Sequence, residues 1–239
     1  MSRTAVCRPT PCLLAPSRVT NAKSYTIRVL APHTVSYKVA LGRARALAHS
    51  RNRRILGIVG MPGSGKSTLT SRVIEALAPE AVNVPMDGFH LANAELARLG
   101  RKQRKGAVDT FDAAGYMALL RRLRELEPGV VVYAPSFNRE IEEPIAGAIS
   151  VPPEVPLVLT EGNYLLVEDG LWAGVRPLLD EAWYVEVDES VRIERLIARH
   201  AAFGKTPEEA RRWSLSSDRA NAELIATTRH RADLVVRVD

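Results

Sequence analysis

The stretch GMPGSGKS at residues 60–67 constrains the fold of this chain more than any other part of the sequence. It matches the pattern G-x-x-x-x-G-K-[ST], which ordinary residue frequencies give by chance in roughly one chain in a hundred of this length. An apolar run at 55–59 precedes it, and apolar residues at helical spacing follow it at 69–77. A glycine-rich loop between a strand and a helix turns successive backbone N–H groups toward phosphate oxygens, and the helix N-terminus adds partial positive charge. We therefore predict a phosphate-binding loop.

The side chains of this loop predict that it binds ATP together with Mg²⁺. Lys66 supplies a mobile positive charge for the β- and γ-phosphates, and Ser67 offers a hydroxyl to the metal ion. The alternative interpretation is a glycine-rich turn with a surface lysine. We expect the nucleotide to contact Gly60, Pro62, Gly63, Ser64, Gly65, Lys66, Ser67 and Thr68.

Strand-like and helix-like segments alternate along the rest of the chain. Helical spacing recurs at 37–49 and at 116–123. Strands separated by helices indicate a parallel sheet that is covered on both faces. We predict an α/β fold, the three-layer sandwich of P-loop NTPases with a mostly parallel sheet and a helical lid. The strand candidates are 55–59, 81–86, 130–134, 155–160, 182–187 and 233–238.

The excess positive charge lies in the first part of the chain. Eleven of the 33 Lys and Arg residues fall within 1–54, which holds no Asp or Glu, so the other 22 stand against 27 acidic residues. A mildly acidic remainder disfavours a nucleic-acid partner. Residues 1–35 show no clear periodicity, and we assign them to a basic flexible leader, with 36–239 as the P-loop domain. A transit peptide, or a start codon assigned too far upstream, would look similar.

The sequence also predicts where the protein is found. No apolar run approaches the roughly 20 residues that span a bilayer. Pro11, Pro16 and Arg18 interrupt the N-terminus where a signal peptide has its apolar core. Cys7 and Cys12 alone make neither a disulfide framework nor a complete zinc site. We expect free thiols, no membrane partner and a cytoplasmic location.

Two acidic residues stand at the ends of predicted strands. Asp87 lies about twenty residues beyond the loop, at the carboxyl end of the next strand, where ligands bind in open α/β sheets. A carboxylate there could accept a proton from an attacking hydroxyl, whereas the alternative is an Asp-Gly turn. Glu161 ends the apolar run at 155–160, the position of a carboxylate that holds Mg²⁺ directly or through water. The alternative for Glu161 is exposure to solvent.

Several short motifs follow one another along the chain: the loop itself, MDGFH at 86–90, RKG at 104–106 with DTFD at 109–112, and TEGNY at 160–164. Their order resembles the phosphoribulokinase/uridine kinase family of P-loop kinases. The resemblance extends over about residues 40–239 and is strongest to the bacterial nucleoside/nucleotide kinase or fructose-kinase-like branch, and more distant to type I pantothenate kinase. It implies Asp87 as catalytic base, Glu161 as a magnesium-site carboxylate, and a lid formed by the helices after Asp188.

The predicted lid covers about residues 189–228. Its second helix has a strong start signal in TPEE at 206–209, with a capping threonine, a proline at the first helical position and a glutamate three residues after the cap. Arg195 and Arg199 are four residues apart and share a helix face. We assign Arg199 to catalysis and Arg195 to the nucleotide, because cations there would neutralise charge during transfer. The alternative is a solvated basic face paired with Glu189 and Glu194.

The acceptor side is predicted at residues 134–144, which we interpret as a loop. Arg139 is the first choice for a contact to a substrate anion or hydroxyl, with an ion pair to Glu142 or Glu143 as the alternative. His90 either contacts substrate or packs at the rim. His200 stands where uridine kinases tend to have an acidic residue, which disfavours a nucleoside-specific interpretation.

Taken together, these features predict an ATP-dependent, P-loop small-molecule kinase that uses Mg²⁺ and acts on a hydroxyl of a small metabolite. A sugar, a nucleoside and a pantothenate-like alcohol all stay open, as does a homodimer. The alternative is a nucleotide-binding switch or NTPase acting on a protein partner. A GTPase would show N-K-x-D, which this chain lacks, and its D-x-x-G match at 112–115 precedes a helix instead of ending a strand. A nucleic-acid-binding ATPase that uses the basic leader is the third alternative.

Overall fold

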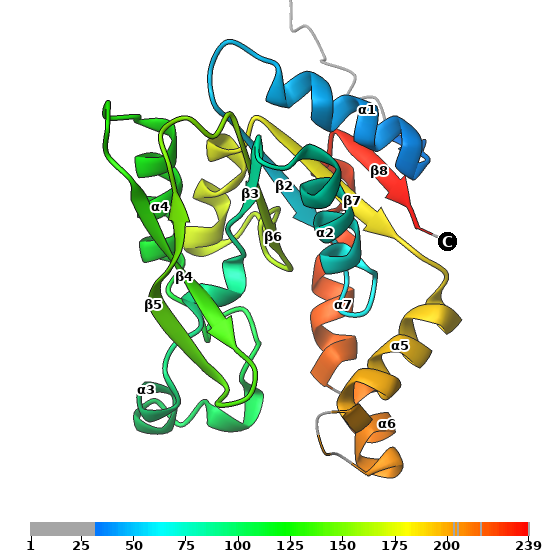
Figure 1. Ribbon diagram of the computed structural model, residues 1–239. Coiled ribbons are helices and arrows are strands. Elements are labelled where there is room, and N and C mark those ends of the chain that lie inside the picture. The colour runs from blue at the N-terminus through cyan, green and yellow to red at the C-terminus, as the bar shows by residue number, and fades with distance from the viewer. Residues whose placement is uncertain (1–31, 203, 205, 216, 239) are drawn as a thin grey trace, which may run out of the picture. The chain divides into compact units, whose positions relative to one another are not determined.

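A parallel sheet forms the centre of the P-loop domain. The computed structural model describes residues 32–238 except 203, 205 and 216, so most of the predicted leader lies outside the described residues. In the described part, six strands pair in the order β1-β8-β7-β2-β6-β3, and every neighbouring pair is parallel (Figure 1). The strands are β1 (His33–Val35), β2 (Arg54–Val59), β3 (Ala81–Asn83), β6 (Leu157–Gly162), β7 (Glu181–Glu186) and β8 (Leu234–Arg237).

Helices cover both faces of this sheet, which confirms the predicted three-layer sandwich. Successive side chains of a strand point to opposite faces. In β2, Ile55 and Val59 join one apolar cluster while Leu56 and Ile58 join the other. The first cluster includes α4 (Ala113–Arg124) and α7 (Ser217–Thr227), and the second includes α1 (Tyr37–Ala48) and α2 (Lys66–Leu77).

The strand predicted at 130–134 is present, but it begins an antiparallel hairpin of β4 (Val132–Asn138) and β5 (Glu143–Val151) that is separate from the parallel sheet. The interpretation of 134–144 as a loop was therefore wrong, since most of these residues are paired strand. A short turn at 139–142 replaces the helical crossover that a parallel partner would need. The mixed Gly, Pro and Ala content of β5 hides the strand in the sequence.

The predicted boundary of the leader also differs from the structure. Strand β1 lies within residues 1–35, yet it pairs with β8 in the register His33↔Leu234 to Val35↔Val236. Three residues carry too little periodicity to be recognised as a strand. Residues 33–35 thus belong to the sheet.

The segment predicted to form a lid consists of α5 (Glu189–Ala202), α6 (Pro207–Leu215) and α7. The start signal of α6 behaves as expected. The Thr206 N–H donates to Glu209 Oε2 at 3.0 Å, and the Glu209 N–H donates to Thr206 Oγ1 at 3.3 Å. None of the helices in the described part of the chain is both long and apolar enough to cross a membrane.

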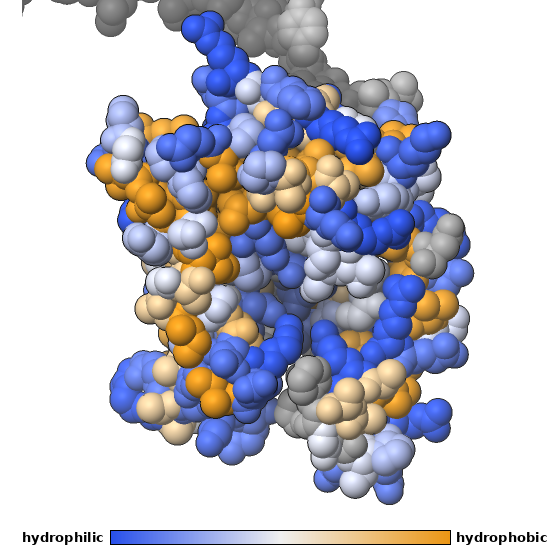
Figure 2. Space-filling view, in the orientation of Figure 1, coloured by the Kyte–Doolittle hydropathy of each residue, from blue (hydrophilic) through white to orange (hydrophobic). Residues whose placement is uncertain are grey.

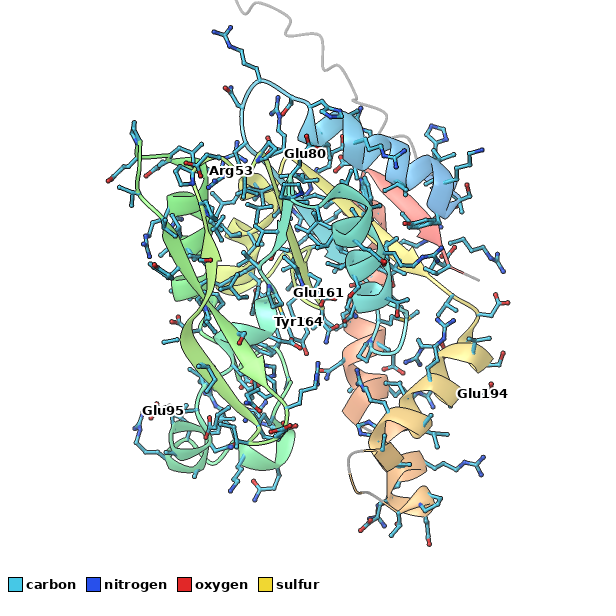
Figure 3. All side chains as sticks on the ribbon, in the orientation of Figure 1. Arg53, Glu80, Glu95, Glu161, Tyr164 and Glu194 are labelled. Atoms are coloured by element: carbon cyan, nitrogen blue, oxygen red, sulfur yellow. The ribbon has the colours of Figure 1, made fainter. Side chains whose placement is uncertain are left out.

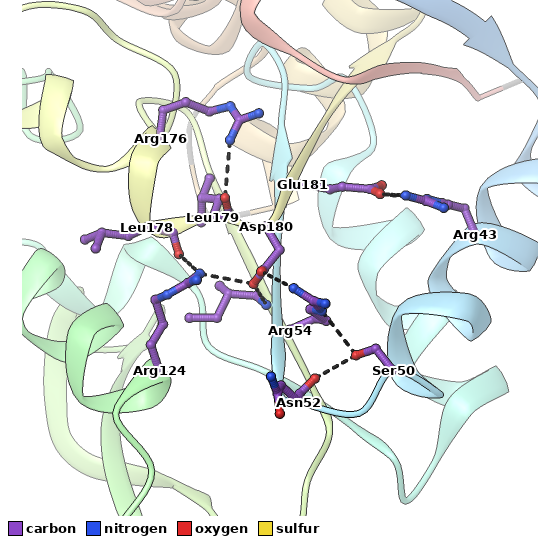
Figure 4. A network of polar contacts seen from close by, with 11 residues as sticks. Arg43, Ser50, Asn52, Arg54, Arg124, Arg176, Leu178, Leu179, Asp180 and Glu181 are labelled. Carbon is purple, nitrogen blue, oxygen red and sulfur yellow. Dashed lines mark hydrogen bonds and ion pairs between the residues drawn. The ribbon is translucent and has the colours of Figure 1, made fainter.

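A network of ion pairs fixes the amino ends of the central strands (Figure 4). Asp180, just before β7, accepts hydrogen bonds from Arg54 Nη1 at 2.9 Å, Arg124 Nη1 at 3.1 Å and the Ile55 N–H at 2.8 Å. This carboxylate thus links β2, α4 and β7 at the amino ends of the strands. The site forms at the opposite end of the sheet, at the carboxyl ends of the strands.

Candidate active site

The predicted phosphate loop connects β2 to α2 and is tightly curled. Gly63 and Gly65 have φ of 81° and 93°, in the left-handed region that favours glycine. A Cβ at Gly63 would lie 2.7 Å from the carbonyl oxygen of Arg192 in α5. Lys66 opens α2, and its Nζ donates to the carbonyl oxygens of Gly60 at 2.8 Å and Met61 at 3.0 Å. The loop therefore has the geometry of a phosphate cradle that rests on α5.

The charge of Lys66 is poorly solvated in this loop. Burial lowers the pKa of Lys66 to about 8, the carboxylates of Glu161 and Asp87 act in the opposite direction, and Arg199 and Arg192 lower it further. Because water solvates this ammonium group poorly, an anionic ligand in the loop would stabilise its charge. The loop thus fits the phosphate tail of a nucleotide.

A magnesium site is suggested by Ser67 and Glu161, where Ser67 Oγ donates to Glu161 Oε2 at 2.9 Å. Glu161 is brought to the loop by the register of β6 with β2, which pairs it with Ile58 (Figure 3). Burial raises the pKa of Glu161, and the Ser67 hydrogen bond and the Lys66 charge only partly oppose it. A hydroxyl and a desolvated carboxylate are oxygen ligands of the kind that Mg²⁺ takes. Among the described residues, no group of three His, Cys, Asp or Glu could hold a metal ion.

Asp87 lies across the same cleft, in a 3-10 turn at Met86–Phe89. The turn packs closely on the end of β6, because a Cβ at Gly162 would lie 2.6 Å from Met86 Cβ. It also packs on the hairpin, since a Cβ at Gly88 would lie 2.4 Å from the carbonyl oxygen of Pro135. Asp87 is therefore held between the end of β6 and the hairpin.

Arg139 makes a contact that the sequence did not predict. Its Nη2 lies 3.3 Å from Asp87 Oδ2. The expected alternative of an ion pair with Glu142 or Glu143 is not what the structure contains. Arg139 follows β4 directly, so the hairpin carries it toward Asp87.

His90 stacks between two aromatic rings, with ring centroids 4.0 Å from Phe111 and 4.5 Å from Phe137. Its Nδ1 lies 2.7 Å from the backbone oxygen of Asp87. Because a carbonyl oxygen only accepts, Nδ1 carries the proton and the neutral ring keeps Nε2 as an acceptor. Burial lowers the pKa of His90, which favours this neutral form.

These groups line one cleft of about 430 Å³. Figure 2 shows a hydrophilic hollow between the hairpin side and the lid side. At the loop side the predicted residues Pro62, Lys66, Ser67, Glu161 and Arg199 line the cleft, and at the hairpin side Asp87, His90 and Arg139 do so. Lys66 and Asp87 therefore share a cavity, as the predicted chemistry requires.

The other predicted nucleotide contacts lie beside the cleft without lining it. Ser64 is fully buried, and its Oγ lies 2.6 Å from the position of a Cβ at Gly60. Arg195 Nη1 lies 3.3 Å from the position of a Cβ at Gly65, so its guanidinium group is next to the loop. Thr68 is exposed at the start of α2.

Several residues at the site were not predicted from the sequence. Arg192 is 2% exposed and pairs with Glu189 at 2.6 Å. Its Nη1 donates to the Pro62 carbonyl at 3.1 Å, so Arg192 supports the backbone of the phosphate loop. Only the family motif at 104–106 pointed to Lys105. The remaining cleft residues without a predicted role are Lys102, Lys105, Gly106, Phe111, Phe137, Glu142, Gly162, Asn163, His200 and Asn221.

Comparison with known proteins agrees with this geometry. Residues 55–238 match the model of the Phosphoribulokinase / Uridine kinase family. This chain belongs to that family. As a phosphoribulokinase/uridine kinase family member it is a P-loop small-molecule kinase, and the family supports ATP-dependent phosphoryl transfer.

Individual relatives cover most of the chain. "Putative uridine kinase C227.14" of Schizosaccharomyces pombe is 33% identical over 222 residues, which cover 88% of this chain and 94% of the relative. "Uncharacterized protein YggC" of Escherichia coli is 32% identical over 79% of each chain. A crystal structure of a "putative fructose transport system kinase" from Silicibacter sp. TM1040 has a TM-score of 0.74 and 36% identity, and covers 82% of this chain and 97% of its own. This family kinase therefore shares its P-loop kinase fold with a solved relative.

Proposed function

We propose that this kinase transfers the γ-phosphoryl group of ATP to a hydroxyl group of a small metabolite, such as a sugar, a nucleoside or a pantothenate-like alcohol. One observation carries the proposal: Lys66, at the phosphate loop, and Asp87, opposite it, line a single cleft. Phosphoryl transfer needs little covalent chemistry from the protein, so catalysis depends on positioning and on electrostatic stabilisation.

At the donor side, the loop N–H groups and Lys66 hold the β- and γ-phosphates. Ser67 and Glu161 would hold Mg²⁺, which would neutralise charge on the phosphate oxygens. Arg199, which also lines the cleft, stabilises the negative charge of the transferring group, and Arg195 contacts the nucleotide beside Gly65.

At the acceptor side, Asp87 orients the attacking hydroxyl. The hydroxyl oxygen forms a bond to the γ-phosphorus while the bond from that phosphorus to the bridging oxygen of ADP breaks. The hydroxyl proton passes to Asp87 Oδ2 or Oδ1. His90 Nε2 accepts a hydrogen bond from a neighbouring hydroxyl of the acceptor, and Arg139 contacts an acceptor oxygen.

The helices α5 to α7 act as the lid that excludes water from the reaction. The contact of Arg192 with Pro62 supports this role, since it links the first lid helix directly to the phosphate loop. Closure of the lid on ATP would therefore also order the loop.

The proposal is tested by measuring ADP release from purified protein with Mg²⁺ and ATP, with and without each of a panel of sugars, nucleosides and hydroxy acids. We expect at least one acceptor to stimulate release well above the ATPase background, and its phosphorylated product to appear in equal amount. If no alcohol stimulates release, and guanine nucleotides bind more tightly than ATP, the chain is a nucleotide switch and the proposal fails.

A further inference from the structure

We propose that the acceptor carries an anionic group, a carboxylate or a phosphate, which binds to Lys102 and Lys105 at the hairpin side of the cleft. This inference rests on the proposed function and adds the class of substrate to it. Both lysines line the cleft that contains Asp87. Neither belongs to the phosphate loop or to the lid, the two parts that contact ATP.

Lys105 is held in position by the protein. Its Nζ donates to Asn93 Oδ1 at 2.8 Å and to the carbonyl oxygen of Glu142. Glu142 has a φ of 55°, a conformation that is uncommon for a residue other than glycine. An ammonium group has three N–H donors, so these two contacts leave one donor for a ligand in the cleft.

The basic residues at 101–105 divide into two groups. Arg101 and Arg104 both pair with Asp109, and Arg101 Nη1 also donates to the Asp109 carbonyl at 2.9 Å. Lys102 and Lys105 line the cleft instead. The two arginines therefore fix the segment, while the two lysines give the cleft wall its positive charge.

The balance of charge at this wall favours an anion. Arg139 pairs with Asp87 at 3.3 Å, so these two groups offset one another. Glu142 is the other carboxylate among the cleft residues on this side, so one negative charge faces the two positive charges of Lys102 and Lys105. Lys102 and Glu142 are exposed to water, whereas Lys105 is partly buried, so Lys105 is the charge that an anionic acceptor would stabilise most.

The partial burial of Lys105 also favours a bound anion. Desolvation lowers the pKa of Lys105, although Glu143 and Glu142 oppose this shift. The carboxylate of Glu143 is itself engaged by the Asn93 N–H at 3.0 Å. The ring of Phe137, 5.2 Å from Lys105 Nζ, forms an apolar surface next to the charge on which the carbon skeleton of a small acceptor can lie.

The test compares anionic acceptors with neutral analogues that have a hydroxyl or hydroxymethyl group in place of the anion, at saturating Mg²⁺ and ATP. Pantothenate against panthenol tests a carboxylate, and fructose 6-phosphate against fructose tests a phosphate. For the acceptor pair that is used, we expect kcat/KM to be at least tenfold higher for the charged member. Lys105→Met and Lys102→Met should each raise the KM for that acceptor by roughly 10- to 100-fold, the range for loss of one charge-assisted hydrogen bond. The KM for ATP should not change.

Lys38→Met, on the exposed surface of α1, is the matched control and should change neither KM. Replacing Lys105 also removes its hydrogen bonds to Asn93 and Glu142, which could disturb the local structure. Lys102→Met separates this effect from the loss of charge, because among the described residues the structure gives the Lys102 side chain no such hydrogen bonds. Equal or better turnover of the neutral members, or lysine variants that change the KM for ATP instead, would overturn the inference.

A binding experiment separates failure of this inference from failure of the proposed function. The protein is saturated with Mg²⁺ and a non-hydrolysable ATP analogue, which fills the phosphate loop, and inorganic phosphate is then titrated by calorimetry. Binding that is present in the wild type and lost in both lysine variants supports the anion site, even if no tested alcohol is phosphorylated. Absence of binding, or binding that both variants retain, contradicts it.

Discussion

Replacing Arg192 by Met should destabilise the protein and weaken ATP binding together. The guanidinium group is buried and donates to the Pro62 carbonyl at 3.1 Å, and a methionine keeps the aliphatic packing but not this bond. A hydrogen bond from a charged group is worth about 1.5–3 kcal/mol. The partner Glu189 is 61% exposed on its side chain, so the ion pair itself adds only about 0–1 kcal/mol. We therefore expect the free energy of unfolding to fall by roughly 2–3 kcal/mol.

Thermal unfolding followed by circular dichroism measures this loss. For a domain of this size, a loss of 2–3 kcal/mol lowers Tm by about 5–10 °C. The KM for ATP should rise as well, because Pro62 lines the cleft and Arg192 holds it. Glu189→Gln is the matched control and should lower the free energy of unfolding by less than about 1 kcal/mol. The reasoning is refuted if Arg192→Met leaves Tm unchanged, or if Glu189→Gln destabilises the protein as much.

Three further predictions concern the surroundings of Asp87 and the proposed metal site. Gly88→Ala places a Cβ 2.4 Å from the Pro135 carbonyl, so it should raise the KM for the acceptor and cost about 1–3 kcal/mol of stability; an unchanged Tm in thermal unfolding would contradict it. Thr160→Val breaks the buried 2.6 Å contact with the Tyr116 hydroxyl and should destabilise by about 1–3 kcal/mol in urea unfolding. Adding Tyr116→Phe should restore part of that loss, and no restoration would count against the pairing. The Tm of the wild type should be higher with ATP and Mg²⁺ than with ATP and EDTA, and Glu161→Gln should abolish this difference. A variant that keeps the whole difference would show that Glu161 does not bind the metal ion.

The parts of this site that follow a local pattern could be predicted from the sequence. The phosphate loop is a contiguous motif between a strand and a helix, and Glu161 ends an apolar strand next to it. Parallel strands bring their carboxyl ends to one edge, so an acid at a strand end falls near the loop. The prediction that Lys66 and Asp87 share a cleft depends on this rule alone, and the structure agrees.

The parts that depend on long-range pairing could not be predicted. The contact of Arg139 with Asp87 and that of Lys105 with Glu142 both require the hairpin of β4 and β5, whose second strand has no clear alternation in its sequence. The role of Arg192 could not be predicted for a different reason. It lies on the same helix as Arg195 and Arg199, and sequence spacing alone does not show which arginine faces the loop backbone and which faces the cleft.

The most direct test of the proposed mechanism is the acceptor-dependent turnover of Asp87→Asn, measured beside its affinity for ATP. Asparagine preserves the shape of the side chain but cannot take the hydroxyl proton. With an acceptor identified by the ADP-release assay, we expect kcat to fall roughly 10²- to 10⁴-fold while the Kd for Mg²⁺ and ATP stays the same. Turnover equal to that of the wild type would show that Asp87 does not activate the acceptor.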